Sequence, residues 1–187
     1  MIQKQNISAI VAVGPDNVIG LNGVMPWHSR QDFYHFKKMT IGNPCIFGKT
    51  TFFNLPKHPL PKRLNIICSS SYQDELIEDC FFASSLENAI KYCYGLPQVF
   101  VCGGGALYKY SFDKDLIDTV YLTQISSPCL SWSVAKNPGA FTRFPFDIST
   151  YFDSNKWSNE QIVYPSGVLP VETSCVTTEF FKYVRTR

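Results

Sequence analysis

The sequence predicts an α/β protein whose mostly parallel sheet is covered by helices on both faces. The chain has 187 residues, the size of one ordinary domain, so we expect residues 1–187 to form a single domain. Apolar residues make up 45% of the chain and charged residues 17%, which allows a sizeable core. Short apolar runs rich in β-branched residues alternate with segments of helical pattern, an order typical of strands that pair in parallel.

The first strand is predicted over residues 7–13, where apolar residues are nearly continuous, as in a strand buried on both faces. Residues 14–28 follow as a long irregular loop, because they contain Gly20, Gly23 and Pro26. Loops of this length inside compact domains are often functional. Ser29 is the expected start of a helix that continues to about residue 40.

The later elements follow from the same patterns. Strands are predicted over residues 43–47, 64–69, 80–83, 98–102 and 119–125, and helices over residues 49–55, 85–94 and 105–112. Residues 127–140 contain two prolines, a glycine and little periodicity, which predicts a surface loop. Two late strands, over residues 157–163 and 174–184, are separated by turn residues and should pair as an antiparallel hairpin.

Charge and cysteine content exclude several classes of protein. The formal net charge is only +2, which argues against a nucleic-acid surface, and no apolar run reaches the roughly 18 residues of a membrane span. The seven cysteines form no CxxC pair, so neither a zinc site nor a disulfide framework is indicated, and we expect a reducing, cytoplasmic setting. His28, His35 and His58 lack the spacing of metal ligands and are expected on the surface or in loops; we expect no metal site.

Three glycines, Gly103 to Gly105, follow a predicted strand and precede a helix. Missing side chains let the backbone approach a ligand, and a helix N-terminus favours a phosphate group. The dinucleotide pattern GxGxxG is not matched, because Tyr108 stands where the last glycine would be. A tight turn between strand and helix with no ligand explains the segment equally well.

The segment Gly48-Lys49-Thr50-Thr51 also lies between a predicted strand and a predicted helix. Its backbone amides, two hydroxyls and one cation could meet a phosphate at the helix N-terminus. It lacks the upstream glycine of a P-loop, which disfavours nucleotide hydrolysis. An ordinary capped helix is the alternative interpretation, and on this segment alone it is favoured.

A carboxylate next to aromatic residues is the third candidate feature. Asp32 and Phe36 are four residues apart on one helix face, and Phe33 lies beside them. Such a carboxylate can hold a flat, nitrogen-rich ring by paired hydrogen bonds while aromatic side chains cover the ring. Alternatively, Asp32 only complements the positive end of its helix.

Together with four further segments, these motifs closely resemble those of the dihydrofolate reductase family. The further segments are VIG at 18–20, MPW at 25–27, PLPKRLNI at 59–66 and YLT at 121–123. All occur in the family's order and at nearly its spacings, from residue 7 to the terminal strand. The resemblance implies a central eight-stranded sheet with an antiparallel C-terminal strand. It also implies hydride transfer from NADPH to C6 of dihydrofolate while N5 gains a proton.

The resemblance also implies a monomer that binds dihydrofolate and antifolate-type small molecules. It further implies which residues form the substrate site. It implies that Asp32 holds the amino group and adjacent nitrogen of the pterin. Thr123 is implied to hydrogen-bond to the Asp32 carboxylate and to the pterin, and Trp27 to reach that carboxylate and the pterin through water. The residues implied to line or close the folate slot are Ile10, Val11, Phe33, Phe36 and Leu55, with Arg63 on the glutamate carboxylate of the substrate.

Cofactor contacts are implied in the same way. Ala12, Ile19 and Gly20 approach the nicotinamide, and residues 14–24 supply a loop that closes over it. The pyrophosphate is implied to lie on Thr51, Gly104 and Gly105, and the 2′-phosphate near Lys49 and Ser70. The rest of the implied cofactor site comprises Thr50, Ser69, Cys102, Gly103, Ala106, Leu107 and Tyr108. The peptide bond between Gly103 and Gly104 is expected to be cis.

Among the departures from the family pattern, which include a longer 127–140 stretch and Lys182 in place of a common glutamate, two concern the cofactor and the loop over it. Lys49 stands where many members have arginine, so the compact charge of an ammonium group replaces a planar guanidinium fork. The acidic residue that the family carries before a late Phe-Pro pair is missing ahead of Phe144-Pro145, so the contact that controls loop closure cannot be carried over. Two other functions remain open: a reductase of a riboflavin-precursor pyrimidine, whose relatives usually lack the Pro-Trp…Asp set, and a noncatalytic nucleotide-binding module.

Overall fold

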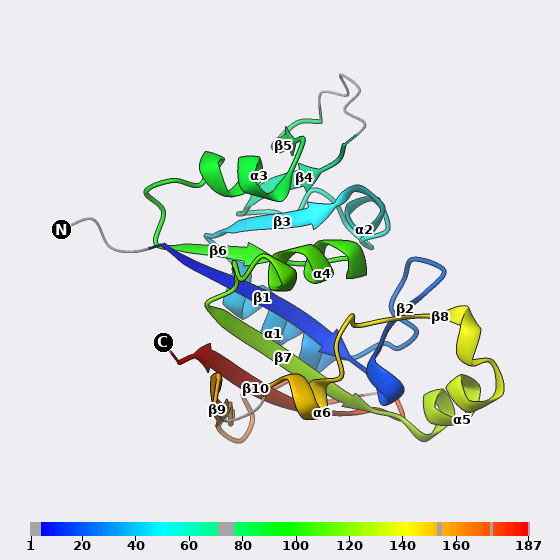
Figure 1. Cartoon of the computed structure of the whole chain (residues 1–187). Helices are drawn as coiled ribbons and strands as arrows, with labels where there is room; N and C mark the ends of the chain where they lie inside the picture. The colour runs from blue at the N-terminus through cyan, green and yellow to red at the C-terminus, as the bar shows by residue number, and fades with distance from the viewer. Residues whose placement is uncertain (1–4, 71–76, 153–154, 173, 187) are drawn as a thin grey trace.

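The apolar run near the N-terminus forms β1 (Asn6–Val13), which lies inside an eight-stranded sheet of the computed structural model (Figure 1). The structure describes residues 5–70, 77–152, 155–172 and 174–186. The other strands of this sheet are β3 (Pro44–Gly48), β4 (Leu64–Cys68), β5 (Cys80–Ala83), β6 (Gln98–Val101), β7 (Thr119–Ser126), β9 (Trp157–Gln161) and β10 (Thr177–Arg185). Their order across the sheet is β5-β4-β3-β6-β1-β7-β10-β9.

The pairing confirms a mostly parallel sheet with an antiparallel C-terminal strand. Strand β1 pairs in parallel with both β6 and β7, and β3 pairs in parallel with β4 and β6. Strand β10 runs antiparallel to β7 and to β9, which confirms the pairing expected for the two late strands. Because the parallel strands all run the same way, the loops after β1, β3 and β6 emerge at one edge, where α/β proteins bind ligands.

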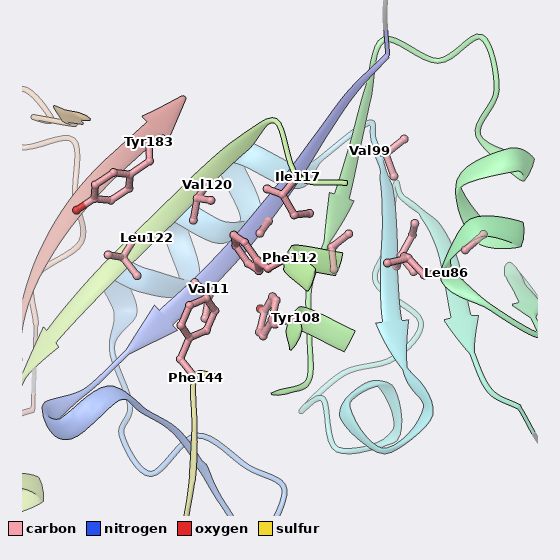
Figure 2. Close-up of a cluster of buried hydrophobic side chains, with 14 of the residues drawn as sticks. Val11, Leu86, Val99, Tyr108, Phe112, Ile117, Val120, Leu122, Phe144 and Tyr183 are labelled. Carbon is pink, nitrogen blue, oxygen red and sulfur yellow. The ribbon is translucent and has the colours of Figure 1, made fainter. Parts of the chain in front are cut away.

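Helices cover both faces of the sheet, as expected, and α1 lies on the opposite side from α3 and α4 in Figure 1. These helices are α1 (Arg30–Thr40), α2 (Lys49–Phe53), α3 (Leu86–Tyr92) and α4 (Gly105–Asp113). Val11 lies near Tyr108 and Phe112 of α4 in a core cluster that also contains Leu86 of α3 (Figure 2). Its neighbour Ile10 packs on the other face, because successive side chains of a strand point to opposite sides.

The expectation of a surface loop over residues 127–140 is wrong. Ser127 caps α5 (Pro128–Lys136), its side chain accepting a hydrogen bond from the backbone N–H of Leu130, and Pro128 occupies the first helical position. Leu130 and Val134 are buried against Val18 in a third apolar cluster. Cap, proline and two apolar residues four apart are a helix signal that the overall composition of the segment obscured.

Residues 14–28 are also more ordered than a long irregular loop. A 3-10 turn (Pro15–Asn17) leads into β2 (Val18–Leu21), which pairs antiparallel with β8 (Phe141–Arg143) in a separate two-stranded sheet. Neither β8 nor the short α6 (Ile148–Tyr151) is predicted from the sequence, because strands and helices of three or four residues carry little periodicity. No helix in the described ranges is both long and apolar enough to cross a membrane.

The expectation that His35 lies on the surface or in a loop is wrong too. Its side chain is fully buried on α1, stacked on Phe180 with 4.5 Å between ring centroids. Nδ1 shares a hydrogen bond of 2.6 Å with the hydroxyl of Tyr164. Burial, together with the positive charge of Lys38, lowers the pKa of His35 from 6.5 to about 4.

His35 should make the folded state sensitive to acid. The unfolded chain protonates this group near pH 6.5 and the folded chain only near pH 4, so stability is lost as the pH falls between those values. We expect the free energy of unfolding to fall by about 2 kcal/mol more in the parent than in His35→Phe between pH 7 and pH 5. Urea unfolding of both proteins at both pH values measures this, and equal losses would contradict it.

Candidate active site

Asp32 lies in the first turn of α1, at the point where the helix meets β7. Ser29 caps the helix, its hydroxyl accepting a hydrogen bond of 3.0 Å from the backbone N–H of Asp32. The Asp32 side chain is 7% exposed and accepts a hydrogen bond from the hydroxyl of Thr123, which is 1% exposed on β7. Since Ser29 supplies the cap, the Asp32 carboxyl is left to face Thr123. This arrangement disfavours the interpretation that Asp32 only complements the helix.

Burial changes the acidity of this carboxyl group. Desolvation raises the pKa of Asp32 from 3.8 to about 6, against the opposing hydrogen bond from Thr123, and the negative charge of Glu172 raises it further. A carboxyl group with a pKa near neutrality, buried at the ligand-binding edge of a sheet, is a candidate for binding and proton chemistry.

Trp27 lies directly before this helix and is 9% exposed. The edge of its six-membered ring lies against Gly14, where an added Cβ would approach Cζ3 to 2.9 Å, and against Leu130 of α5. Its indole Nε1 is buried and has no hydrogen-bond partner among the described residues. A buried donor of this kind calls for a partner, which fits the expected contact to substrate through water.

Apolar side chains continue from Asp32 along α1. Ile10 is buried in a cluster on this face of the sheet, and Phe36 and Leu55 pack against that cluster, as expected. Phe33 lies nearer the outside, with its ring 5.3 Å from that of His28. The side chain of Val11 is not brought to the slot, because strand alternation places it on the opposite face (Figure 2).

Arg63 lies at the far end of α1. Its Nε donates to Thr40 Oγ1 at 3.0 Å, and its guanidinium carbon is 5.9 Å from the centre of the Phe36 ring. With a helical rise of about 1.5 Å per residue, Asp32 and Thr40 are separated by roughly 12 Å along the helix. A carboxylate therefore lies near the start of α1 and a cation near its end.

The two glycine-containing turns meet at the carboxyl ends of β3 and β6. The backbone N–H of Gly48 donates to the carbonyl of Gly103 at 2.7 Å, and a Cβ added to Gly104 would lie 2.7 Å from Thr51 Oγ1. Gly103 has a φ of +105°, which favours glycine, and the Gly103–Gly104 peptide bond is cis, as expected. These residues leave a narrow backbone cradle that side chains would fill, which fits the pyrophosphate of NADPH.

The remaining cofactor candidates lie on several elements near the carboxyl edge of the sheet. Tyr108 is buried beneath the cradle, and its hydroxyl donates to the carbonyl of Ile10 at 2.6 Å. Ile19 reaches the cradle from β2, since a Cβ on Gly105 would lie 3.7 Å from Ile19 Cδ1. Lys49 and Thr50 lie in the first turn of α2, and Ala106 lies in the first turn of α4. Ser69 and Ser70 follow β4, and Cys102 follows β6. Ala12 packs against the cluster that contains Trp27, and Gly20 lies next to Val24. Leu107 packs against the core cluster that also contains Tyr108.

Sequence reasoning missed an ion pair that joins the loop after β1 to β8. Both Nε and Nη2 of Arg143 donate to Oδ2 of Asp16, at 3.0 and 2.7 Å. Arg143 Nη1 also donates to the carbonyl of Pro138 at 2.6 Å. The missing acidic residue before Phe144 is thus replaced by a contact in which the loop carries the acid and β8 the base. No motif signals this pairing, because the two residues are 127 positions apart.

Glu172 is the second missed residue. Its carboxylate lies against the first residues of α1, next to Asp32, although it comes from the connection between β9 and β10. The described part of the chain contains no cluster of three or more His, Cys, Asp or Glu residues that could hold a metal ion, and none was expected.

A backbone cradle suited to a dinucleotide lies beside a slot suited to a flat ring with several donors. This combination is typical of reductases that use a nicotinamide cofactor. The chain is accordingly similar to such enzymes. The profile of the family described as "Dihydrofolate reductase" matches residues 6–138.

Individual relatives agree. Dihydrofolate reductase of Candida albicans is 34% identical over 138 residues, covering 68% of this chain and 72% of that protein. The Haemophilus influenzae enzyme is 36% identical over 133 residues, covering 67% and 80%. The solved structure of dihydrofolate reductase from Enterococcus faecalis, complexed with NADP(H) and RAB-propyl, has the same fold. It matches with a TM-score of 0.73 at 24% identity, and the match covers 100% of both chains.

The chain belongs to the dihydrofolate reductase family. It is an oxidoreductase that reduces dihydrofolate to tetrahydrofolate with NADPH. The alternatives of a pyrimidine reductase and of a noncatalytic module are thereby set aside.

Neutralising either partner of the Asp16–Arg143 pair should loosen the loop over the cofactor cradle. Arg143→Gln and Asp16→Asn are each expected to raise the KM for NADPH roughly twofold to fivefold, the effect of about 0.5–1 kcal/mol from a partly exposed ion pair. The double variant should be no worse than the singles, because all three remove the same interaction. Lys109→Gln, at the exposed Lys109–Asp113 pair on α4, is the matched control and should leave this KM unchanged. Additive single effects would show that the two side chains act separately.

Proposed function

We propose that Asp32, Thr123 and Trp27 bind and orient the pterin ring of dihydrofolate, with Asp32 as its polar anchor. The observation that carries this assignment is the buried Asp32 carboxyl, bonded to Thr123, on a helix whose Phe36 packs against the apolar cluster that contains Ile10. A carboxylate can accept two hydrogen bonds side by side, each contributing roughly 1.5–3 kcal/mol when the acceptor is charged. Pterin presents an amino group and a ring nitrogen that match this geometry.

Asp32 also supports the proton that must reach N5. An ionised carboxylate stabilises a protonated pterin, so it favours the form of the substrate that accepts a hydride. Because burial raises the pKa of Asp32 to about 6, the group can also hold or release a proton near neutral pH. The indole N–H of Trp27 is the donor expected to contact the substrate through water.

The other end of the slot is assigned to the glutamate tail of the substrate. Arg63 is already held by three acceptors, Thr40 Oγ1 and the carbonyls of Pro61 and Lys37, which fix its guanidinium beside Phe36. A fixed guanidinium suits a carboxylate. Ile10, Phe36 and Leu55 supply the apolar walls between the two ends.

NADPH supplies the hydride when it is bound. Gly48, Thr51, Gly103 and Gly104 would hold its pyrophosphate, because they form the cradle between β3 and β6. Residues 14–24, tied to β8, would exclude water from the nicotinamide end of the slot.

The wider setting is part of the same proposal. We propose that the protein acts as a monomer in the cytoplasm and binds no nucleic acid. The near balance of 17 basic and 15 acidic residues supports the last point, and all seven cysteines are free thiols, as in a reducing compartment.

Asp32→Asn is expected to fold normally, to bind NADPH, and to lose at least about a hundredfold in kcat/KM for dihydrofolate, or roughly 2.7 kcal/mol. The asparagine removes the charge and presents a donor toward the donors of the pterin. The loss should shrink at low pH, where substrate arrives already protonated. Steady-state kinetics across the pH range measure this.

The same variant separates anchoring from helix capping through stability. Because the folded-state pKa of Asp32 is raised, the ionised group costs the folded protein about 3 kcal/mol at pH 7, and this cost disappears as the pH falls through 6 toward 3.8. Asp32→Asn should therefore be at least as stable as the parent at pH 7. A capping role predicts the reverse, a less stable variant with nearly intact activity.

Lys49→Ala should raise the KM for NADPH and spare NADH, because Lys49 is assigned to the phosphate that only NADPH carries. The preference of the parent for NADPH should weaken with rising salt, since the contact joins charges near the surface. Kinetics with both cofactors measure this. An equal loss with both would show that Lys49 does not contact the 2′-phosphate.

A further inference from the structure

The connection between β9 and β10 crosses the start of α1 and is hydrogen-bonded to it at several points. Residues 170–172 and 174–178 of this connection and of β10 are called the strap below. Gln31 Nε2 donates to the carbonyl of Pro170 at 3.2 Å, and Ser174 Oγ donates to the carbonyl of His28 at 2.6 Å. The hydroxyl of Thr178 is bonded to the Gln31 side chain as well. The strap thus fixes the backbone on both sides of the N-cap, Ser29.

Glu172 makes the central contacts of the strap. One carboxylate oxygen accepts hydrogen bonds from Ser29 Oγ at 2.5 Å and from the backbone N–H of Gln31 at 2.8 Å. The other accepts from the backbone N–H of Arg30 at 3.3 Å and from Ser174 Oγ at 3.4 Å. The first N–H groups of a helix lack partners within the helix, and they favour negative charge. Glu172 therefore satisfies the N-terminus of α1 from a distant part of the chain.

These contacts lead directly to the substrate anchor. The hydroxyl of Ser29 donates to Glu172 and at the same time accepts from the backbone N–H of Asp32 at 3.0 Å. Asp32 in turn accepts from Thr123 on β7. If Glu172 moved, the Ser29 hydroxyl would move with it and would shift Asp32, the residue proposed to face the pterin. Ångström-scale misplacement of such a group is costly for catalysis.

We propose that Glu172 is a positioning residue of the substrate site, which holds the first turn of α1 so that the Asp32 carboxyl faces both Thr123 and the pterin. This inference rests on the proposed role of Asp32 as the anchor. Nothing in the resemblance to the family assigns a role to this glutamate.

Electrostatics give Glu172 a second effect on the same group. Partial burial acts to raise the pKa of Glu172, but the hydrogen bonds from Ser29, Gln31, Arg30 and Ser174 hold it below its ordinary value, so the group stays ionised. Its negative charge then raises the pKa of Asp32.

Other titratable groups around Asp32 do not compete with this charge near neutral pH. Tyr108, from α4, interacts with Asp32 but stays neutral, because burial raises its pKa well above 10. His35, one turn further along α1, stays neutral because burial and the Lys38 charge lower its pKa to about 4. Arg30 lies two residues before Asp32, is exposed, and is not changed in any of the variants.

Two substitutions separate position from charge. Glu172→Ala removes every contact of the carboxylate and should lower kcat/KM for dihydrofolate about tenfold while leaving the KM for NADPH unchanged. Glu172→Gln keeps an acceptor for Ser29 and Gln31 but removes the charge. It should retain most of the efficiency and shift the apparent pKa of Asp32 in the pH profile of kcat/KM downward. Glu78→Gln, an exposed glutamate on the turn before β5, is the matched control and should change neither quantity.

The decisive measurement combines the alanine variant with Asp32→Asn. If Glu172 acts through Asp32, Glu172→Ala should cause no further loss of efficiency in that background. A loss of the same factor in both backgrounds, or an unchanged efficiency in Glu172→Ala, would overturn the proposal. A thermal melt of each variant separates loss of the helix cap from loss of function. Full activity of Asp32→Asn would overturn the anchoring role itself, whereas an inactive Asp32→Asn beside a fully active Glu172→Ala would overturn only the role of Glu172.

Discussion

Asp32 is buried where the first turn of α1 meets β7, and the proposed substrate site depends on the cost of keeping its carboxyl there. Desolvation disfavours the ionised group by enough to raise its pKa to about 6. One hydrogen bond from Thr123 offsets part of that cost. In the proposed role of Asp32, a bound pterin would supply the further hydrogen-bond partners that the carboxylate can accept.

The position of that carboxyl depends on three elements from distant parts of the chain. Ser29 fixes the start of α1 locally, β7 brings Thr123 to the same point, and Glu172 reaches the helix from the far side. Each contact is short and directional. Exposed ion pairs, by comparison, contribute little on their own, so the Asp16–Arg143 contact acts on the position of a loop and adds little to global stability.

The cofactor side follows a different physical rule. Here the proposed binding groups belong to the backbone, because Gly103 and Gly104 carry no side chains that would fill the turn at the carboxyl ends of β3 and β6. Tyr108 supports that turn from beneath by its hydrogen bond to Ile10, which links the cradle to β1 and so to the substrate slot. The proposed substrate and cofactor sites therefore share one edge of the sheet.

Sequence by itself determined the features whose signals are local. Continuous apolar runs predicted the parallel strands, Ser29 and Ser85 predicted helix starts, and the glycine turns and the Asp32 segment predicted the two halves of the site. Only the tertiary structure decided which side chains face the slot, since Ile10 and Val11 differ by strand alternation that depends on where the helices pack. It also decided the contacts of Glu172 with Ser29 and of Arg143 with Asp16. The partners of the first contact are separated by 143 positions in the sequence and those of the second by 127. Such pairings leave no trace in local periodicity, because they are set by how the whole chain packs.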